Sequence, residues 1–218
     1  MNSISDDFRH FVMFFPVFLI AMVVHEFAHA WVADKCGDQT ARFSGRLTLN
    51  PLAHIDPIGT VILPLLAFMS RSNFLIGWAK PVPVNPYNFR RPGRDNALVS
   101  VAGVSANLLL AVVCAVLFRV FLRVYHESNV MDFILVLLMA CVHFNCLLAI
   151  FNMIPIPPLD GSHVLGVVFP NSTLLKRMQM NPLIGLAVLM LLLFMLGNYV
   201  IVKPTAVLTN LLIGRNLM

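Results

Sequence analysis

The sequence has few charged side chains. Aspartate, glutamate, lysine and arginine make up 11% of its 218 residues, against about 25% in an ordinary soluble domain. Hydrophobic residues supply 59%, and the mean hydropathy is +0.83. This composition excludes an ordinary soluble domain and predicts an all-α polytopic membrane protein. The formal charge of +5 does not indicate nucleic-acid binding, because the basic residues are spread among short loops.

Cysteine is also scarce. The four cysteines form no Cys-x-x-Cys pair, and three of them lie in apolar segments. We therefore interpret them as small packing residues and exclude a cysteine-based metal site or a disulfide framework. The chain also leaves no room for an appended soluble domain of ordinary size. We expect residues 1–218 to form a single integral-membrane domain.

Long apolar runs predict the membrane spans, because a helix needs about 20 residues to cross the hydrocarbon. The predicted spans are 11–33, 57–70, 98–122, 133–152 and 182–202. The second is short and contains two prolines, so we interpret 57–79 as a span with a re-entrant return. The total is thus four to six transmembrane segments. We expect the tail, 203–218, to form a short interfacial helix.

Residues 40–49 differ from the apolar runs. Polar and apolar residues alternate on both sides of Ser44-Gly45, a pair typical of a tight turn. The pattern predicts a small membrane-associated β-hairpin. Its unpaired edge would let an extended substrate add as a strand.

The first span holds the most informative residues. His25, Glu26 and His29 are the only ionisable groups between residues 11 and 33, and such groups in hydrocarbon are costly and usually functional. Histidines at i and i+4 share one helix face and can hold one zinc ion. The intervening glutamate is the usual general base of a zinc peptidase.

A catalytic zinc needs a third protein ligand, and Asp160 is the best candidate. It follows Pro155, Pro157 and Pro158 at the end of an apolar span, where the prolines forbid a continuous helix. A fold-back ending at Gly161 would bring this short carboxylate to a metal. On residue chemistry alone, it is about equally plausible that Asp160 caps a helix starting near Gly161.

The paired motifs resemble one known family. His-Glu-x-x-His in an early span, with Asn-x-x-Pro-x-Pro-x-Leu-Asp-Gly at 152–161, is similar to the site-2 protease family of intramembrane zinc metalloproteases. The segments 50–59 and 77–85 resemble a bacterial branch of it. The resemblance implies one Zn²⁺ held by His25, His29 and Asp160, with Glu26 activating the water. The family's Gly-Pro-x-x-Asn motif appears at 103–107 without its proline.

Two amides in apolar surroundings and three further histidines have open roles. Asn107 and Asn152 either join helices by hydrogen bonding or donate to the oxyanion of a tetrahedral intermediate. Asn152 is the stronger oxyanion candidate, which the resemblance favours. His54 is expected to stabilise a turn, His143 to pack in a helix, and His163 to be a second-shell or alternative ligand.

These patterns predict hydrolysis of a peptide bond within or near the transmembrane segment of a single-span membrane protein. The alternatives are a metal-binding or transport protein and an inactive protease-like scaffold. Loops 34–57, 78–97 and 162–181 hold nine lysines and arginines, against six elsewhere. This bias predicts a cytoplasmic location for the motif-bearing end, in a bacterial inner membrane.

Overall fold

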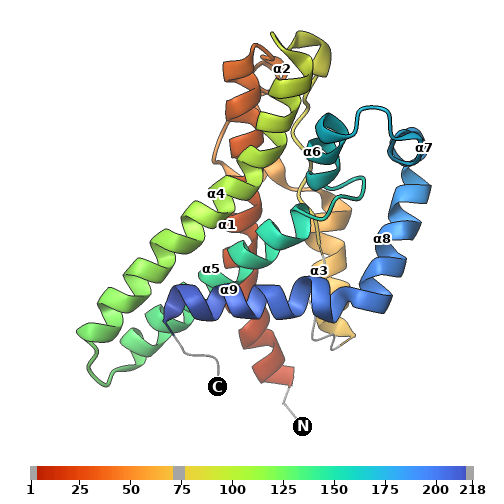
Figure 1. The fold of residues 1–218 in the computed structure, drawn as a ribbon. Helices are drawn as coiled ribbons and strands as arrows, with labels where there is room; N and C mark the ends of the chain where they lie inside the picture. The colour runs from red at the N-terminus through yellow and green to blue at the C-terminus, as the bar shows by residue number, and fades with distance from the viewer. Residues whose placement is uncertain (1–3, 71–76, 215–218) are drawn as a thin grey trace.

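The computed structural model describes residues 4–70 and 77–214. Within these ranges the chain is helical and has no β-strand, which confirms the all-α prediction. Figure 1 shows long helices that cross one another, with the short helices α2, α6 and α7 toward the top of the view. The α-helices are α1 (Ile4–Cys36), α2 (Thr40–Phe43), α3 (Leu63–Met69), α4 (Pro92–Arg123), α5 (Asn129–Asn152), α6 (Gly161–Val168), α7 (Thr173–Met180), α8 (Pro182–Gly197) and α9 (Lys203–Ile213). Four shorter helical turns are η1 (Pro51–His54), η2 (Pro57–Ile62), η3 (Pro86–Asn88) and η4 (Asn198–Val202).

Four of the described helices are long and apolar enough to cross a membrane. They are Phe11–Cys36, Pro92–Arg123, Asn129–Asn152 and Pro182–Ile213. Each contains one of the four longest predicted spans. The long helices begin where local chemistry favours a start: Pro92 and Pro182 occupy first-turn positions, and the Ser128 side chain accepts from the Met131 N–H.

The predicted β-hairpin over 40–49 is wrong. Residues Thr40–Phe43 form the single helical turn α2, and the Thr40 N–H donates to the Asp38 carboxylate just before it. The expected turn does occur, with Gly45 at φ +67°, but it ends this helical turn instead of joining two strands. The Asp38–Thr40 hydrogen bond and the helical hydrogen bonds that follow it outweigh an alternation only a few residues long.

The short apolar run forms one 13-residue helix, from Pro57 through Met69. The Asp56 side chain caps it by accepting from the N–H groups of Ile58 and Gly59. The expected return lies partly on residues 71–76, outside the described residues. The chain then continues as an extended segment over 77–85, which we call the strap.

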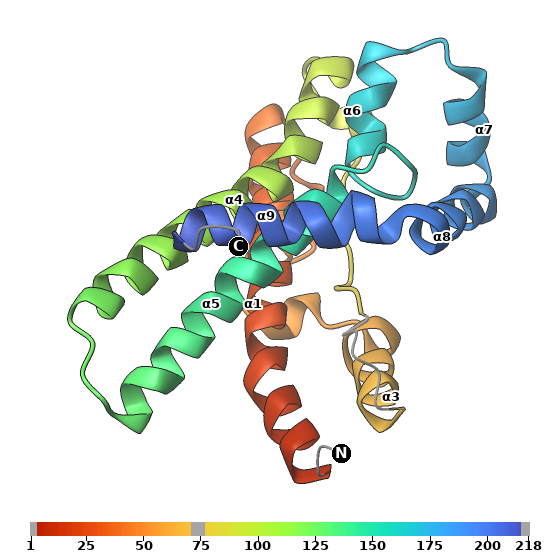
Figure 2. The same ribbon diagram turned by 60° about the horizontal axis from the view of Figure 1, so that its bottom comes forward.

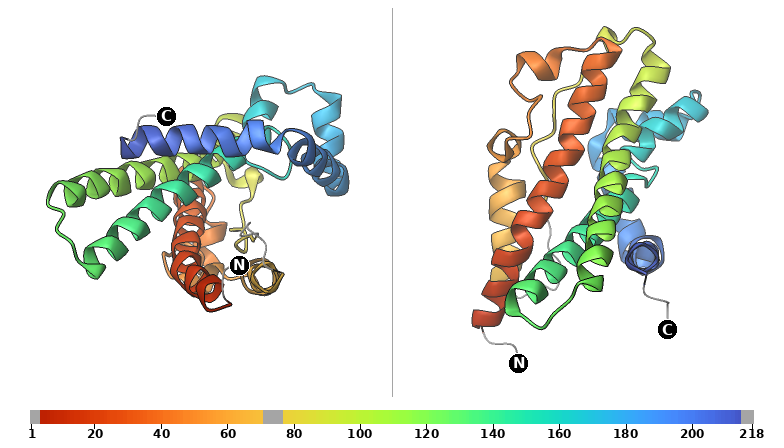
Figure 3. Two further views of the ribbon diagram at one scale, coloured as in Figure 1. Left: turned by 90° about the horizontal axis from the view of Figure 1, so that it is seen from below. Right: turned by 90° about the vertical axis from the view of Figure 1, so that its left-hand side faces the viewer.

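The last span is longer than predicted. Helix α8 continues through the π-helical turn η4 into α9, so the tail does not begin as a separate helix at residue 203. Figure 3 shows α9 lying across α4 and α5, while α8 turns away from them. Irregular π turns are known places for such changes of direction.

Small residues let α4, α5 and α9 pack closely. One buried cluster joins Ala111, Cys114 and Ala115 of α4 to Val142 and Cys146 of α5, with Ile213 of α9 covering it. The Sγ atoms of Cys114 and Cys141 are 3.0 Å apart between the two helices. Figure 2 shows α4 and α5 as a long hairpin. This close packing fixes α4 against its neighbours, as is typical of membrane helices.

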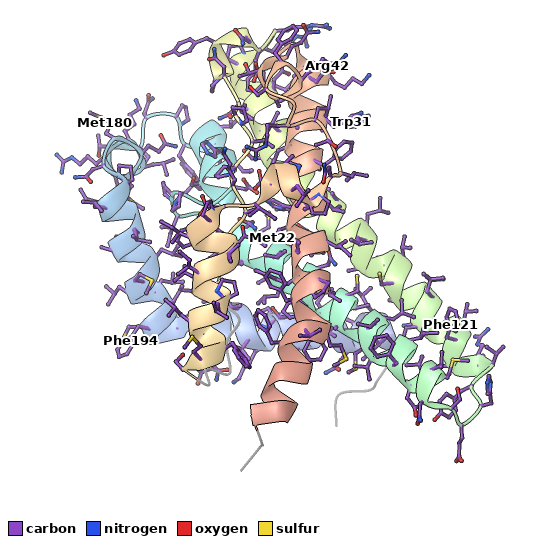
Figure 4. All side chains as sticks on the ribbon, turned by 180° about the vertical axis from the view of Figure 1, so that it is seen from behind. Met22, Trp31, Arg42, Phe121, Met180 and Phe194 are labelled. Atoms are coloured by element: carbon purple, nitrogen blue, oxygen red, sulfur yellow. The ribbon has the colours of Figure 1, made fainter. Side chains whose placement is uncertain are left out.

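Helix α1 packs against α4 and α5 near its middle. Phe18 and Met22 of α1 form a buried cluster with Ala79 of the strap, and Phe144 of α5 packs against it. Figure 4 shows Met22 midway along α1, with Trp31 and Arg42 toward one end of the molecule and Phe121 toward the other. The metal-ligand motif at 25–29 therefore lies between the middle of α1 and the end that leads to α2.

Candidate metal centre

The three predicted metal ligands lie together. His25 and His29 occupy consecutive turns of α1, and their Nε2 atoms are 2.9 Å apart. Asp160 Oδ2 lies 3.1 Å from His25 Nε2 and 3.2 Å from His29 Nε2. The three atoms form a nearly equilateral triangle, although 131 residues separate His29 from Asp160.

Asp160 reaches the histidines because the chain folds back after α5. A Cβ added to Gly161 would lie 2.3 Å from the Met153 carbonyl oxygen, so only glycine permits this close approach. The Asp160 side chain makes no helix-capping hydrogen bond. The fold-back interpretation is thus confirmed over the capping one.

Hydrogen bonds fix which nitrogen of each histidine faces the triangle. The Val99 carbonyl oxygen is 2.7 Å from His29 Nδ1, and because a carbonyl only accepts, Nδ1 carries the hydrogen. Asn107 Oδ1 is 2.7 Å from His25 Nδ1. The Asn107 amide donates to the Ala21 carbonyl and to Asn145 Oδ1, so its oxygen is the atom that accepts from His25. In the neutral form of each imidazole, Nδ1 carries the hydrogen and Nε2 is the acceptor that faces Asp160.

The donor set fits a zinc ion. In a tetrahedral zinc site with bonds of roughly 2.0–2.1 Å, neighbouring ligand atoms lie roughly 3.3–3.4 Å apart, close to the observed edges. Both histidines are buried, and the buried Asp160 Oδ2 has no hydrogen-bond partner in the described part of the chain. Three converging acceptors repel one another unless a cation lies between them.

Gly103 of α4 gives the histidines their space. A Cβ at this position would lie 2.5 Å from His29 Nε2 and 2.6 Å from His25 Cε1. Asn107, one turn along α4, makes the hydrogen bond to His25. The 103–107 motif thus places Gly103, which has no side chain, and the Asn107 amide against the two histidines. The missing proline affects neither of these two groups.

Glu26 is held by the strap. Its Oε2 accepts a hydrogen bond of 2.8 Å from the Val82 backbone N–H. This contact holds the Glu26 carboxylate against the strap. Sequence reasoning gave no sign of Val82, because the donor is a backbone group whose partner depends on the fold.

The remaining predicted polar residues take different positions. Both hydrogens of the Asn107 amide have acceptors, whereas the Asn152 amide donates one, to the Leu148 carbonyl. His54 is buried and bonded to the Thr48 carbonyl, as expected for a turn residue. His143 packs against Phe144. His163 lies one turn into α6, where burial lowers its pKa.

Asn145 was missed by the sequence analysis. It is fully buried in α5, accepts from Asn107 and donates to the Cys141 carbonyl. An asparagine in the interior of a predicted apolar span is a signal that could have found it. It completes a buried chain from α5 through Asn107 of α4 to the metal ligand His25 of α1.

The chain is similar in sequence to known proteins. The chain is 36% identical over 186 residues to the "putative zinc metalloprotease YwhC" of Bacillus subtilis, covering 84% of this chain and 81% of that protein. The chain belongs to the site-2 protease family. It is also 30% identical over 151 residues to the "putative zinc metalloprotease Rip2" of Mycolicibacterium smegmatis, covering 69% of this chain and 55% of that protein.

A Rip2 from Mycobacterium tuberculosis is 33% identical over 155 residues, again covering 55% of that protein. No family model and no solved structure matches the chain. Membership of the site-2 protease family agrees with the resemblance drawn from the paired motifs. The names of the relatives also imply zinc for the site built from His25, His29 and Asp160.

Proposed function

We propose that this protein is an intramembrane zinc metalloprotease. It would hydrolyse a peptide bond within or near the transmembrane segment of a single-span membrane protein. One observation carries the proposal: two histidine nitrogens inside an apolar helix converge with Asp160 Oδ2, and a glutamate lies between those histidines in sequence. Ligand triads of this kind leave a fourth position of the metal open for water or substrate.

Each residue has a role in this proposal. His25, His29 and Asp160 would hold the zinc, which when bound polarises the scissile carbonyl and lowers the pKa of water toward about 7. Glu26 would take the water proton and pass it to the leaving amine. The amide of Asn107 keeps His25 in the tautomer that presents Nε2.

Asn152 is the better supported oxyanion donor of the two amides. Its hydrogen bond to the Leu148 carbonyl uses one amide hydrogen and leaves the other available, while Asn107 has acceptors for both. It lies at the end of α5, directly before the fold-back that carries Asp160. An amide there would stabilise negative charge on the substrate carbonyl oxygen.

The location of the site fits a membrane substrate. His25 is eight residues before Ala33 on α1, about 12 Å of helical rise, so the ligands lie a short way inside one end of the span. We propose that this end faces the cytoplasm of a bacterial inner membrane, because the basic residues are biased toward its loops. Water could then reach the site while the substrate helix remains partly in lipid.

The alternatives are less well supported. A transporter needs ionisable groups along a path through the membrane, whereas His25, Glu26 and His29 occupy about one turn of α1. An inactive scaffold would not need the glutamate, which is present and held in place by a hydrogen bond.

Metal content and cleavage together test the proposal. Purified protein should contain stoichiometric zinc by mass spectrometry, Glu26→Gln should keep it, and Asp160→Ala should lose it or bind it far more weakly. In liposomes with a panel of single-span membrane proteins, wild type should cut at least one within its apolar segment, and Glu26→Gln should cut none. Zinc without Glu26-dependent cleavage would favour the scaffold or transport alternatives.

A further inference from the structure

The strap, residues 77–85, approaches the metal centre from a part of the chain that supplies no metal ligand. It directs its backbone donors inward at alternate residues. The N–H of Trp78 donates to the Gly59 carbonyl, that of Lys80 to the His54 carbonyl, and that of Val82 to Glu26 Oε2. The last of these connects the strap to the proposed general base.

The sequence of the strap restricts it to this conformation. Pro81 and Pro83 have fixed φ angles, and each disfavours a helical conformation in the residue before it. Val82 lies between them. Its N–H is therefore held in an extended backbone that has little conformational freedom even before the hydrogen bond to Glu26 forms. The two prolines also have no N–H, so the outward edge of the strap lacks donors there and is poorly suited to pairing with a substrate strand.

A buried arginine binds the backbone carbonyl groups of the strap next to the Val82 N–H. Arg46 Nη2 donates to the carbonyl oxygens of Lys80 and Pro81, at 2.5 and 3.3 Å. Its side chain is 8% exposed, and it makes no ion pair with a carboxylate in the described ranges. In the Pro81–Val82 peptide, the carbonyl therefore accepts from the Arg46 guanidinium, and the N–H donates to the Glu26 carboxylate. Charges at both ends strengthen such hydrogen bonds.

We propose that the strap positions the general base, with Val82 and Arg46 as positioning residues. This rests on the proposed function of Glu26. One carboxylate oxygen is occupied by the Val82 N–H, so the carboxylate cannot rotate freely and its second oxygen faces a fixed direction. The strap would thereby set the orientation in which Glu26 meets the attacking water, an effect worth more to turnover than to substrate binding.

The contact itself can be tested without any substrate. Amide exchange, followed by NMR on protein labelled with ¹⁵N-valine, should show the Val82 amide protected in wild type. In Glu26→Ala it should exchange about tenfold faster or more, because a hydrogen bond to a charged acceptor is lost. Val84, in the same strap but not bonded to Glu26, is the internal control. Equal Val82 exchange in the two proteins would overturn the proposal.

Removal of the donor tests the effect on catalysis. Val82→Pro deletes the N–H while keeping an extended backbone, and Val82→Ala keeps the N–H with a smaller side chain. We expect Val82→Pro to retain zinc and lose about tenfold to a hundredfold in kcat with little change in KM, and Val82→Ala to stay near wild type. Wild-type kcat in zinc-loaded Val82→Pro, or equal losses in both variants, would overturn the proposal.

Arg46 supplies a test that leaves Val82 intact. Arg46→Met should lower kcat and speed Val82 exchange while zinc stays bound, and Arg46→Lys should recover part of both, since an ammonium can donate to one carbonyl. If wild type cleaves no substrate, the proposed function fails, but the exchange measurements still decide whether the strap holds Glu26. If the exchange measurements fail while cleavage persists, only the positioning proposal is lost.

Discussion

At the scale of single residues, Asn107 links the metal centre to the helix packing around it. Its oxygen accepts from His25 Nδ1, and its amide donates to α1 and to Asn145 of α5. A polar side chain with all of these partners cannot be replaced without leaving buried groups unpaired. The same residue therefore affects both the orientation of a ligand and the docking of three helices.

We expect Asn107→Ala to weaken zinc binding about tenfold to a hundredfold, because His25 loses the partner that fixes its tautomer. The dissociation constant can be measured by competition with a zinc chelator in detergent. Asn152→Ala is the matched control: it should keep zinc affinity while lowering turnover, as the oxyanion role predicts. Equal zinc affinity in Asn107→Ala and wild type would contradict the orienting role.

Gly103 is a second residue on which the metal centre depends, because it has no side chain. In Gly103→Ala the new methyl group would contact both imidazoles at under 3 Å, so we expect loss of bound zinc and a lower melting temperature. Gly93→Ala, in the same helix with open space around it, should be neutral or mildly stabilising, since alanine favours helix by about 1 kcal/mol. Zinc content and thermal unfolding of the pair provide the comparison. Full zinc occupancy in Gly103→Ala would show that α4 does not approach the histidines this closely.

At the scale of elements, one buried carboxylate fastens the end of the strap. Asp38, just after α1, accepts hydrogen bonds from the Asn85 N–H, the Asn88 amide and the Thr40 N–H. Burial raises the pKa of Asp38, but these hydrogen bonds outweigh it and leave the pKa below its usual value of 3.8. These hydrogen bonds therefore need the ionised carboxylate of Asp38.

The lowered pKa of Asp38 sets how the stabilisation from these hydrogen bonds depends on pH. Because the folded pKa is lower than the unfolded one, the stabilisation is fully present above about pH 4 and is lost as the pH falls through the folded value. We expect Asp38→Asn to melt below wild type at pH 7 and the two melting temperatures to converge in acid. Thermal unfolding in detergent between pH 7 and pH 3 measures this. A difference that stays constant across this range would show that ionisation of Asp38 does not matter.

The elements also show what sequence reasoning can and cannot reach. His25, Glu26 and His29 share a helix turn, so their spacing alone predicts that they act together, and the prolines before Asp160 predict a break that lets it approach. The hairpin at 40–49 failed because alternation over a few residues is a weak signal, and the Thr40 N–H bonds to the Asp38 carboxylate at the start of a helical turn instead. The Val82 contact could not be predicted, since backbone donors are identical at every residue and only the fold selects one.

At the scale of the whole molecule, the two ends differ in character. The end with α2, η1 and η3 has most of the loops that surround the strap, while the opposite end of α4 and α5 is a single short connection at 124–128 (Figure 1). The metal ligands lie nearer the first end. Under the proposed function, the side of the membrane that this end faces would decide which compartment supplies the water and receives the released fragment.

Single cysteines can determine the orientation. In a background without the four native cysteines, His126→Cys should react with a membrane-impermeant maleimide in intact spheroplasts. Ser44→Cys should react only after lysis. Both positions are exposed in the fold, so a lack of labelling reports on the membrane and not on burial. The reverse pattern would place the metal centre at the outer side.

The long separation between His29 and Asp160 in the sequence also sets the order in which the metal ligands are synthesised. Chains emerge from the ribosome at about 5–20 residues per second, so α1 enters the membrane many seconds before the third ligand has been made. The strap and α4 arrive in between. A nascent chain thus carries both histidines and the glutamate but no complete metal centre. Under the proposed function, peptidase activity would begin only when the segment that carries Asp160 has been made and inserted.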